Sequence, residues 1–447
     1  MTSSIHTRRR SFLSGLAGLG MGASVGGSFF PGLVSAAEQQ ARKNGRHCIL
    51  LWMSGGPSQI DTFDLKPNHT NGGPFKESAS SEAGLRLSEH LPKLAQQADR
   101  LAVLRGLSTK EGDHERGTTI MRTGHPKGGP VHYPAIGCSL SKALANAECK
   151  LPGYVSITPG PFAASSLRPG FLGPRYAATT VRAAASNPAA AVLNGLMGND
   201  FADLRVEHLQ SSVPVDSDRY RSRMQLWDSM QQSFLRSRPT ANSITHDTVY
   251  RSAIEMLGSD AKDAFNLDQE PAAVREAYGK SAFGQGCLMA RRLIERGVPI
   301  VEVTLGEGLG WDTHADNFER VKELSGSLDA GWSTLMTELS DRGLLERTTL
   351  LWAGEFGRTP TINASGGRDH FPQAFSAVLA GGGIAGGQAY GATSEDGMEV
   401  VDGKITQQDL LATLCRALGV DPSTENMAEG GRPIAIAEGE AIDAVLS

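Results

Sequence analysis

Histidine and carboxylate side chains recur in the loops that follow short apolar runs of this sequence. Imidazole and carboxylate groups together form the ligand set of zinc, manganese and similar divalent cations. The loops therefore predict a site for a divalent metal ion, whether zinc, manganese, calcium or magnesium. The candidate ligands are Asp61, Asp312, His314, Glu355, Asp369 and His370.

The spacing of these residues supports part of this set. Side chains alternate along an extended segment, so Asp312 and His314 can point the same way. Asp369 and His370 cannot do so on a strand, but in a loop the carboxylate can orient the imidazole from behind. The ligand atoms of a shared metal should lie within about 5 Å of a common point. Each residue also has a plainer interpretation as a cap, a turn former or a solvated group.

Other polar side chains in the same loops have types suited to proton transfer or anion binding. His114 and Thr118 follow the second apolar run, and His114 is a candidate acid, base or nucleophile. Arg358 and Arg368 are candidates for holding an anionic group, because a guanidinium matches phosphate, sulfate or carboxylate. The alternative for both arginines is a salt bridge to a neighbouring carboxylate.

The elements that would position these residues are buried strands separated by helices. Helices are expected at 317–341 and 408–418. Strands joined by helices of this length predict an α/β fold, a parallel sheet with helices on both faces and right-handed crossovers. In such sheets ligands bind beyond the carboxyl ends of the strands. The predicted strands are 47–53, 101–104, 153–158, 299–304, 348–353 and 375–380.

Residues 181–278 have a different texture from the rest of the chain. Alanine-rich and charged segments with helical spacing dominate there, and strand patterns are scarce. We interpret this region as a helical insertion or cap, and the alternative is a set of ordinary crossover helices.

Composition excludes several classes of protein. The chain has 447 residues, of which 40% are hydrophobic and 20% charged, which is typical of a globular protein with a sizeable core. There are 43 basic and 48 acidic residues without a basic stripe, so nucleic acid is not an expected partner. Five scattered cysteines do not form a disulfide framework.

Two sequence patterns do not support a familiar activity. Gly381, Gly383 and Gly386 match a dinucleotide-binding pattern, but no helix is expected after them, so we assign them to turns and close packing. The sequence has no Gly-x-Ser-x-Gly motif, so a serine hydrolase elbow is not predicted.

The first 37 residues have the layout of an export signal. Arg8, Arg9 and Arg10 precede Phe12 and Leu13, a weakly apolar run follows, and small residues end the segment at Ala36. The order resembles a twin-arginine signal, with an ordinary secretory signal or an uncleaved anchor as the alternatives. The expectation is a mature chain of residues 38–447 outside the cytoplasm, in the periplasm or beyond, with the twin-arginine translocase as a partner during export.

Several motifs in order resemble the bacterial family called domain of unknown function 1501. They are GGPSQIDTFDLKP (55–67), GWDTHADNF (310–318), GEFGRTP (354–360), GGRDHFP (366–372) and LAGGGIAGGQAYGATSEDG (379–397). That family is similar to the alkaline phosphatase and arylsulfatase superfamily. The resemblance implies an alkaline-phosphatase-like α/β fold over residues 38–447 with metal ions at the carboxyl ends of the strands.

The resemblance also implies roles for single positions. Asp312 with His314, and His370, are the nearest counterparts of the superfamily's metal ligands, while Glu355 stands near a place where that superfamily has Asp and His. Thr123-Gly124 resembles the end of the sulfatase motif, and nine residues earlier, where a nucleophile is expected, stands His114. Formylglycine chemistry is therefore not expected.

These observations lead to two hypotheses. The first is an exported, metal-dependent hydrolase of a small phosphate or sulfate ester. The second is a metal-stabilised binding or scaffold protein that has lost the superfamily's nucleophile. The sequence predicts neither the substrate nor the oligomeric state.

Overall fold

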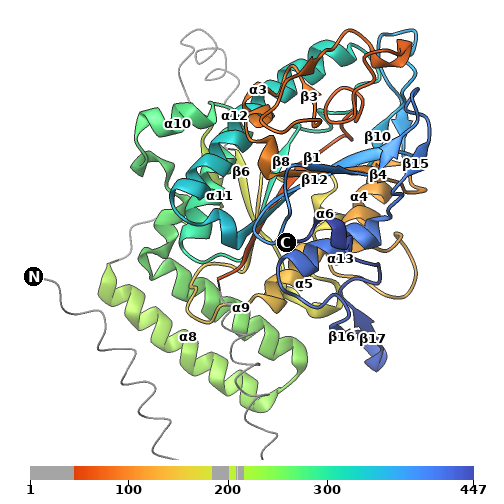
Figure 1. Ribbon diagram of the computed structural model, residues 1–447. Coiled ribbons are helices and arrows are strands. Elements are labelled where there is room, and N and C mark those ends of the chain that lie inside the picture. The colour runs from red at the N-terminus through yellow and green to blue at the C-terminus, as the bar shows by residue number, and fades with distance from the viewer. Residues whose placement is uncertain (1–44, 184–200, 208, 210–215) are drawn as a thin grey trace, which may run out of the picture. The chain divides into compact units, whose positions relative to one another are not determined.

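A computed structural model describes residues 45–183, 201–207, 209 and 216–447. The predicted export signal at residues 1–37 lies outside the described residues. The central element is a nine-stranded sheet with the order β13-β4-β12-β9-β1-β8-β5-β6-β7 (Figure 1). Its strands are β1 (His47–Met53), β4 (Leu101–Leu107), β5 (Tyr154–Ile157), β6 (Thr179–Ala183), β7 (Leu204–Val206), β8 (Ile300–Leu305), β9 (Thr348–Gly354), β12 (Phe375–Gly381) and β13 (Gln388–Tyr390).

The α/β prediction is confirmed, and all six predicted strands are present. The sheet is mixed rather than wholly parallel, however, which corrects the expectation. β1 pairs in parallel with β8 and β9, but β12 runs antiparallel to both β9 and β4. Parallel neighbours need a crossover that is usually a helix, and the segment between β9 and β12 contains none. The chain therefore returns directly, and β12 begins at the edge where β9 ends.

Helices cover both faces of the sheet (Figure 1). On β1, Ile49, Leu51 and Met53 join the core on the side of α11 (Ala282–Glu295) and α12 (Asn317–Asp341). The alternate residues Cys48, Leu50 and Trp52 join the core on the side of α5 (Ile136–Ala143) and α13 (Gln407–Ala417). A strand that is buried on both faces has a continuous run of apolar residues, and this pattern is why β1 could be predicted from the sequence.

The remaining elements are shorter or lie away from the central strands. None of the helices in the described ranges is long and apolar enough to span a membrane. The helices are α3 (Pro92–Ala95), α4 (His114–Thr123), α6 (Ala163–Ser166), α8 (Ser217–Ser237), α9 (Ala241–Leu257) and α10 (Ala272–Tyr278). The small two-stranded pairs are β2 (Glu77–Ser78) with β3 (Leu87–Ser88), β10 (Gly357–Arg358) with β11 (His370–Phe371), β14 (Ala392–Thr393) with β15 (Val400–Asp402), and β16 (Glu425–Met427) with β17 (Pro433–Ala435).

The region 181–278 contains both strands and helices where the structure describes it. It opens with the end of β6, which pairs antiparallel with β7 at the edge of the main sheet. Helices α8, α9 and α10 follow. Its interpretation as an insertion stays a prediction.

Packing explains the glycines that follow β12. Gly381 has a φ of +81°, and a Cβ there would lie 2.2 Å from the Thr348 carbonyl oxygen. A Cβ on Gly383 would lie equally close to the Ala417 carbonyl oxygen. No helix follows them before α13, so these residues serve a tight turn against neighbouring backbone, as expected.

We predict that Gly381→Ala destabilises the fold far more than Gly419→Ala. Both positions have positive φ, which disfavours alanine, but nothing lies within 4 Å of a Cβ at Gly419. The Gly419 change should therefore show only the backbone strain of roughly 1–2 kcal/mol, whereas Gly381→Ala adds an overpacking penalty of about 1–3 kcal/mol. Denaturant unfolding measures both. Equal losses would contradict this account of the turn.

Candidate metal centre

The candidate residues meet at one edge of the sheet. Parallel strands β1, β4, β8 and β9 end there, and the loops after β4, β8 and β9 carry His114, Asp312 and Glu355 respectively. His370 reaches the same edge from the other direction. It lies on β11, just before the start of the antiparallel strand β12. The reversal of β12 is therefore what brings His370 to the other ligands.

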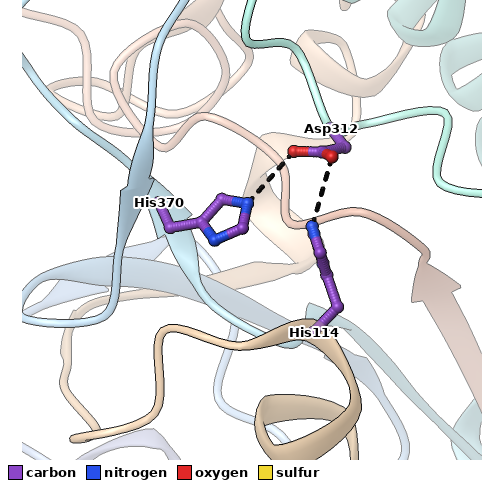
Figure 2. A group of neighbouring side chains, drawn as sticks. All are labelled: His114, Asp312 and His370. Atoms are coloured by element: carbon purple, nitrogen blue, oxygen red, sulfur yellow. Dashed lines mark hydrogen bonds and ion pairs between the residues drawn. The ribbon is translucent and has the colours of Figure 1, made fainter.

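His114, Asp312 and His370 form a compact cluster (Figure 2). One ligand atom from each residue lies within 4.8 Å of the other two. Asp312 stands between the histidines: its Oδ2 is 3.3 Å from His114 Nε2 and its Oδ1 is 3.2 Å from His370 Nε2. An Asp and two His at these distances are donors of the type and spacing that a divalent cation takes.

The second ring nitrogen of His114 and of His370, Nδ1, forms a hydrogen bond on the side away from the cluster. His114 Nδ1 donates to Glu355 Oε1 at 2.7 Å, and His370 Nδ1 donates to the Gly112 carbonyl oxygen at 2.7 Å. Neither acceptor can donate, so each neutral ring carries its free lone pair on Nε2, toward the cluster. Metal-binding histidines nearly always have such a partner on the second nitrogen. In the neutral form, both rings therefore have the tautomer that a metal site requires.

His314 and Asp369 extend the cluster toward solvent. His314 Nε2 is 3.1 Å from Asp312 Oδ1 and 3.1 Å from His370 Nε2. Its Nδ1 contacts Asp369 at 2.7 Å, so Asp369 orients His314 rather than its own neighbour His370. The hydrogen bond to His314 is the largest of the effects that hold the pKa of Asp369 below its usual value. The distances among Asp312, His314 and His370 fall within the limit expected for a shared metal.

Glu355 is fully buried behind His114. Its Oε1 accepts from the Gly55 amide at 2.8 Å as well as from His114. Its Oε2 is buried and has no hydrogen-bond partner among the described residues, and neither does His114 Nε2 by strict geometry. Buried polar atoms without partners are rare in folded proteins. Once the His114 ring is neutral, its Nε2 is an acceptor that a cation at the His-Asp-His cluster would satisfy, so these residues fit a metal ion.

Asp312 is strongly stabilised as a carboxylate. Burial opposes its ionisation, but hydrogen bonds from His114 and His370 and the charge of Arg358 hold its pKa far below the usual range. Arg358 Nη2 lies 2.6 Å from Asp312 Oδ1. Burial also lowers the pKa of Arg358, and Asp312 opposes that shift. Asp312 is therefore an anionic donor in the metal-free protein.

His114 is charged in the metal-free protein. Burial works against the protonated imidazole, but contacts with Asp312 and Glu355 outweigh it and raise the pKa of His114 to about 9. The residue is the first of helix α4, whose cap is Asp113. The Asp113 side chain accepts from the Arg116 amide, which fixes where the helix starts and hence where His114 stands.

Asp61 and Arg368 lie together and outside the cluster. Both are fully buried, and Arg368 donates to the two oxygens of Asp61 at 2.8 and 3.0 Å. Asn317 also donates to Asp61 at 2.8 Å. The remaining Arg368 donors bond to the carbonyl oxygens of Asn71, Thr359 and Pro360. All donors of this arginine thus have protein acceptors, as in the salt-bridge alternative.

Arg358 and Thr118 complete the set of predicted site residues. Arg358 is fully buried and donates to the carbonyl oxygens of Gly55, Gly56 and Arg368 besides Asp312. Thr118 is buried on α4, one turn after His114. Sequence reasoning missed the backbone groups that matter here, the Gly112 carbonyl and the Gly55 amide, because backbone partners leave no mark on residue type.

The fold and the cluster define an α/β protein with a candidate metal centre at the carboxyl edge of its sheet. The chain belongs to the family described as "Protein of unknown function (DUF1501)", whose model matches residues 45–446. The sequence matches no curated protein.

Several solved structures are similar to this chain at low identity. The PsFucS1 sulfatase from Pseudoalteromonas sp. is 11% identical, with 87% of this chain and 70% of that chain covered and a TM-score of 0.39. The phosphonate monoester hydrolase of Agrobacterium radiobacter is 11% identical, with 90% and 77% covered and a TM-score of 0.36. The phosphonate monoester hydrolase SpPMH from Silicibacter pomeroyi is 10% identical, with 89% and 76% covered and a TM-score of 0.36. These TM-scores are too low to infer an activity from the structural similarity.

We predict that Arg368→Ala lowers the free energy of unfolding by about 3–5 kcal/mol, because it leaves the Asp61 carboxylate buried and unpaired. The matched control is Arg221→Ala, which breaks the exposed pair with Asp218 and should leave stability almost unchanged. Chemical denaturation measures both.

Metal content separates a structural role of Asp61 from a ligand role. Asp61→Asn protein that remains folded should bind as much zinc as the wild type, because its partners are Arg368 and Asn317. A folded Asp61→Asn variant with sub-stoichiometric zinc would identify Asp61 as a ligand.

Proposed function

We propose that this protein is an exported, metal-dependent hydrolase of a phosphate or sulfate ester. The observation that carries the proposal is the convergence of His114, Asp312 and His370, with both imidazoles held by Nδ1 partners so that Nε2 is available. Polarisation of an ester oxygen and a lowered pKa of water are what a divalent cation supplies when bound at such a site.

In this proposal the buried and half-buried residues hold the cation and the exposed ones face the substrate. His114, Asp312 and His370 are the ligands, and Glu355 keeps His114 in place. Beside the cluster, His314 is the most exposed of the three histidines, at 47% of its side chain, and Asp369 orients it. Its position is therefore suited to carrying a proton to or from the reacting ester.

Two features of the site favour an anionic substrate. Helix α4 begins at His114, so the positive end of its dipole lies at the cluster. The Arg358 guanidinium pairs with Asp312 and offsets the negative charge of that carboxylate, which would otherwise repel an anion. Export to the periplasm remains part of the proposal and depends on the resemblance of the first 37 residues to a twin-arginine signal.

Two observations favour the alternative, a metal-stabilised binding or scaffold protein. His114 stands where the superfamily's hydroxyl or thiol nucleophile is expected, and none of the three cluster residues carries such a group. In addition, the guanidinium groups of Arg358 and Arg368 donate their hydrogen bonds to protein acceptors, so neither is free to bind an anion in this arrangement. In that case the cation would hold the loops together without chemistry.

We predict that purified protein carries a stoichiometric divalent metal ion and hydrolyses an aryl phosphate or an aryl sulfate. Asp312→Asn should lower the metal content and reduce kcat/KM by at least about 100-fold, because outer-shell changes alone reach 10–100-fold. The matched control is His132→Gln, which changes an exposed histidine outside the cluster.

Elemental analysis and steady-state kinetics are the two measurements. Metal bound without hydrolysis of either ester would favour the scaffold, and protein free of metal after reconstitution with zinc would reject both functions.

The affinity for metal should depend on pH through His114. Because the pKa of His114 is raised to about 9 in the folded metal-free protein, binding at pH 7 must displace its proton. Zinc affinity should therefore rise by up to about tenfold per pH unit from pH 7 and level off above pH 9. The stability of the metal-free protein should change in the opposite direction and fall as the pH rises. Protonated His114 contributes its full stabilisation below about pH 6.5, and this contribution is lost as the pH rises through about 9.

Competition titrations at several pH values measure the affinity. Glu355→Gln removes one of the charges that raise the pKa of His114, so the rising limb should move to lower pH. A zinc affinity that is constant between pH 7 and 9 would contradict the assignment of His114 as a ligand.

A further inference from the structure

Exposed apolar side chains gather on two helices far from the metal centre in sequence. Helices α8 and α9 pack side by side (Figure 1). Of the ten large hydrophobic residues that are exposed in the described part of the chain, seven lie on these helices. They are Tyr220, Leu226, Met230, Phe234, Ile244, Val249 and Tyr250. Such concentration of exposed apolar surface marks an interaction site.

The apolar residues of α8 form a stripe along one face. Leu226, Met230 and Phe234 are spaced by four residues, so they follow one another along the helix, and they are 63%, 64% and 42% exposed. Met224 and Leu235 lie on the other side of the helix. The half-buried Trp227 flanks the stripe, three residues before Met230 and seven before Phe234, and stacks on Tyr250 of α9. The stripe therefore borders the contact with α9 on its Trp227 side, while Leu226, Met230 and Phe234 themselves stay exposed.

The same face of α8 carries unpaired positive charge. Arg219 and Arg223 precede Leu226 at helical spacing, are exposed, and have no ion-pair partner among the described residues. The carboxylates nearby are engaged: Asp218 pairs with Arg221, and Asp228 pairs with Arg251. This basic character is local, because the whole chain has a net charge of −5.

We propose that α8 docks this protein on an anionic phospholipid surface. A helix with an apolar stripe and arginines on the same side lies in the headgroup region, its apolar side chains reaching toward the acyl chains. Each arginine near such a surface is attracted by the negative potential of the lipids. Leu226, Met230 and Phe234 would enter the membrane boundary, and Arg219 and Arg223 would contact lipid phosphates.

The charge of α8 favours a membrane over a second copy of the chain as the partner that covers the apolar stripe. Helix α8 holds four arginines and two aspartates between residues 217 and 237, and both aspartates are already paired. Two copies that met along this stripe would bring two positively charged helices together. An anionic lipid surface supplies the opposite charge.

Vesicle flotation with the full chain tests the proposal. The wild type should bind vesicles of phosphatidylcholine with about one third phosphatidylglycerol and bind pure phosphatidylcholine much more weakly. A Leu226→Gln, Met230→Gln, Phe234→Gln triple variant should lose about tenfold or more in partition, since binding scales with the apolar area inserted. An Arg219→Gln, Arg223→Gln variant should lose the preference for anionic vesicles and the salt dependence of binding.

The matched control is Val401→Ser with Met427→Gln, two exposed apolar residues outside α8 and α9. It should bind as the wild type does, and because every variant has the same N-terminal segment, differences report α8 alone. Circular dichroism confirms that each variant is folded. Unchanged binding by the triple variant, or no binding by the wild type, would overturn the proposal. The proposal would also be overturned if the wild type formed a dimer in ultracentrifugation, the triple variant were a monomer, and neither protein bound lipid.

Discussion

The carboxylate of Asp312 is the group on which the candidate centre depends. It lies within 3.1–3.3 Å of the Nε2 atoms of His114, His314 and His370, and 2.6 Å from the Arg358 guanidinium. A half-buried carboxylate with few water contacts needs such compensation to stay ionised. The negative charge attracts the imidazoles, and the same arrangement brings their Nε2 atoms together around one carboxylate. In the metal-free state a proton on His114 takes the place that a cation would occupy.

A second set of contacts holds these groups from outside. Glu355, Asp369 and the Gly112 carbonyl each accept a hydrogen bond from one of the three histidines. The Glu355 carboxylate also accepts from the Gly55 amide, so the end of β1 is tied to the end of β9 directly beneath the cluster. Rigid strand ends thus position the loops, which is the reason an open α/β sheet can carry a precise site on irregular segments.

The sequence and the structure agree best where burial alone decides. Apolar runs such as those of β1 and β9 are buried on both faces, and their pattern required a strand with no further information. The sequence predicts the structure less well where the role of a polar residue depends on which side chain it contacts. Arg368 and Asp61 have residue types suited to an anion and a metal, yet they neutralise each other in the core. Neither their types nor their distance along the chain indicates which opposite charge each would meet.

By itself, the sequence determined the α/β class, the places where strands end and the supply of imidazole and carboxylate groups in the loops that follow. These features depend on local pattern, because strands and turns are set by burial and by neighbouring residues. The tertiary structure alone decided that β12 runs antiparallel and brings His370 to Asp312, that Asp369 serves His314, and that Glu355 stands behind His114. Those choices join residues up to 256 positions apart, from His114 to His370, and only the packed sheet makes them neighbours.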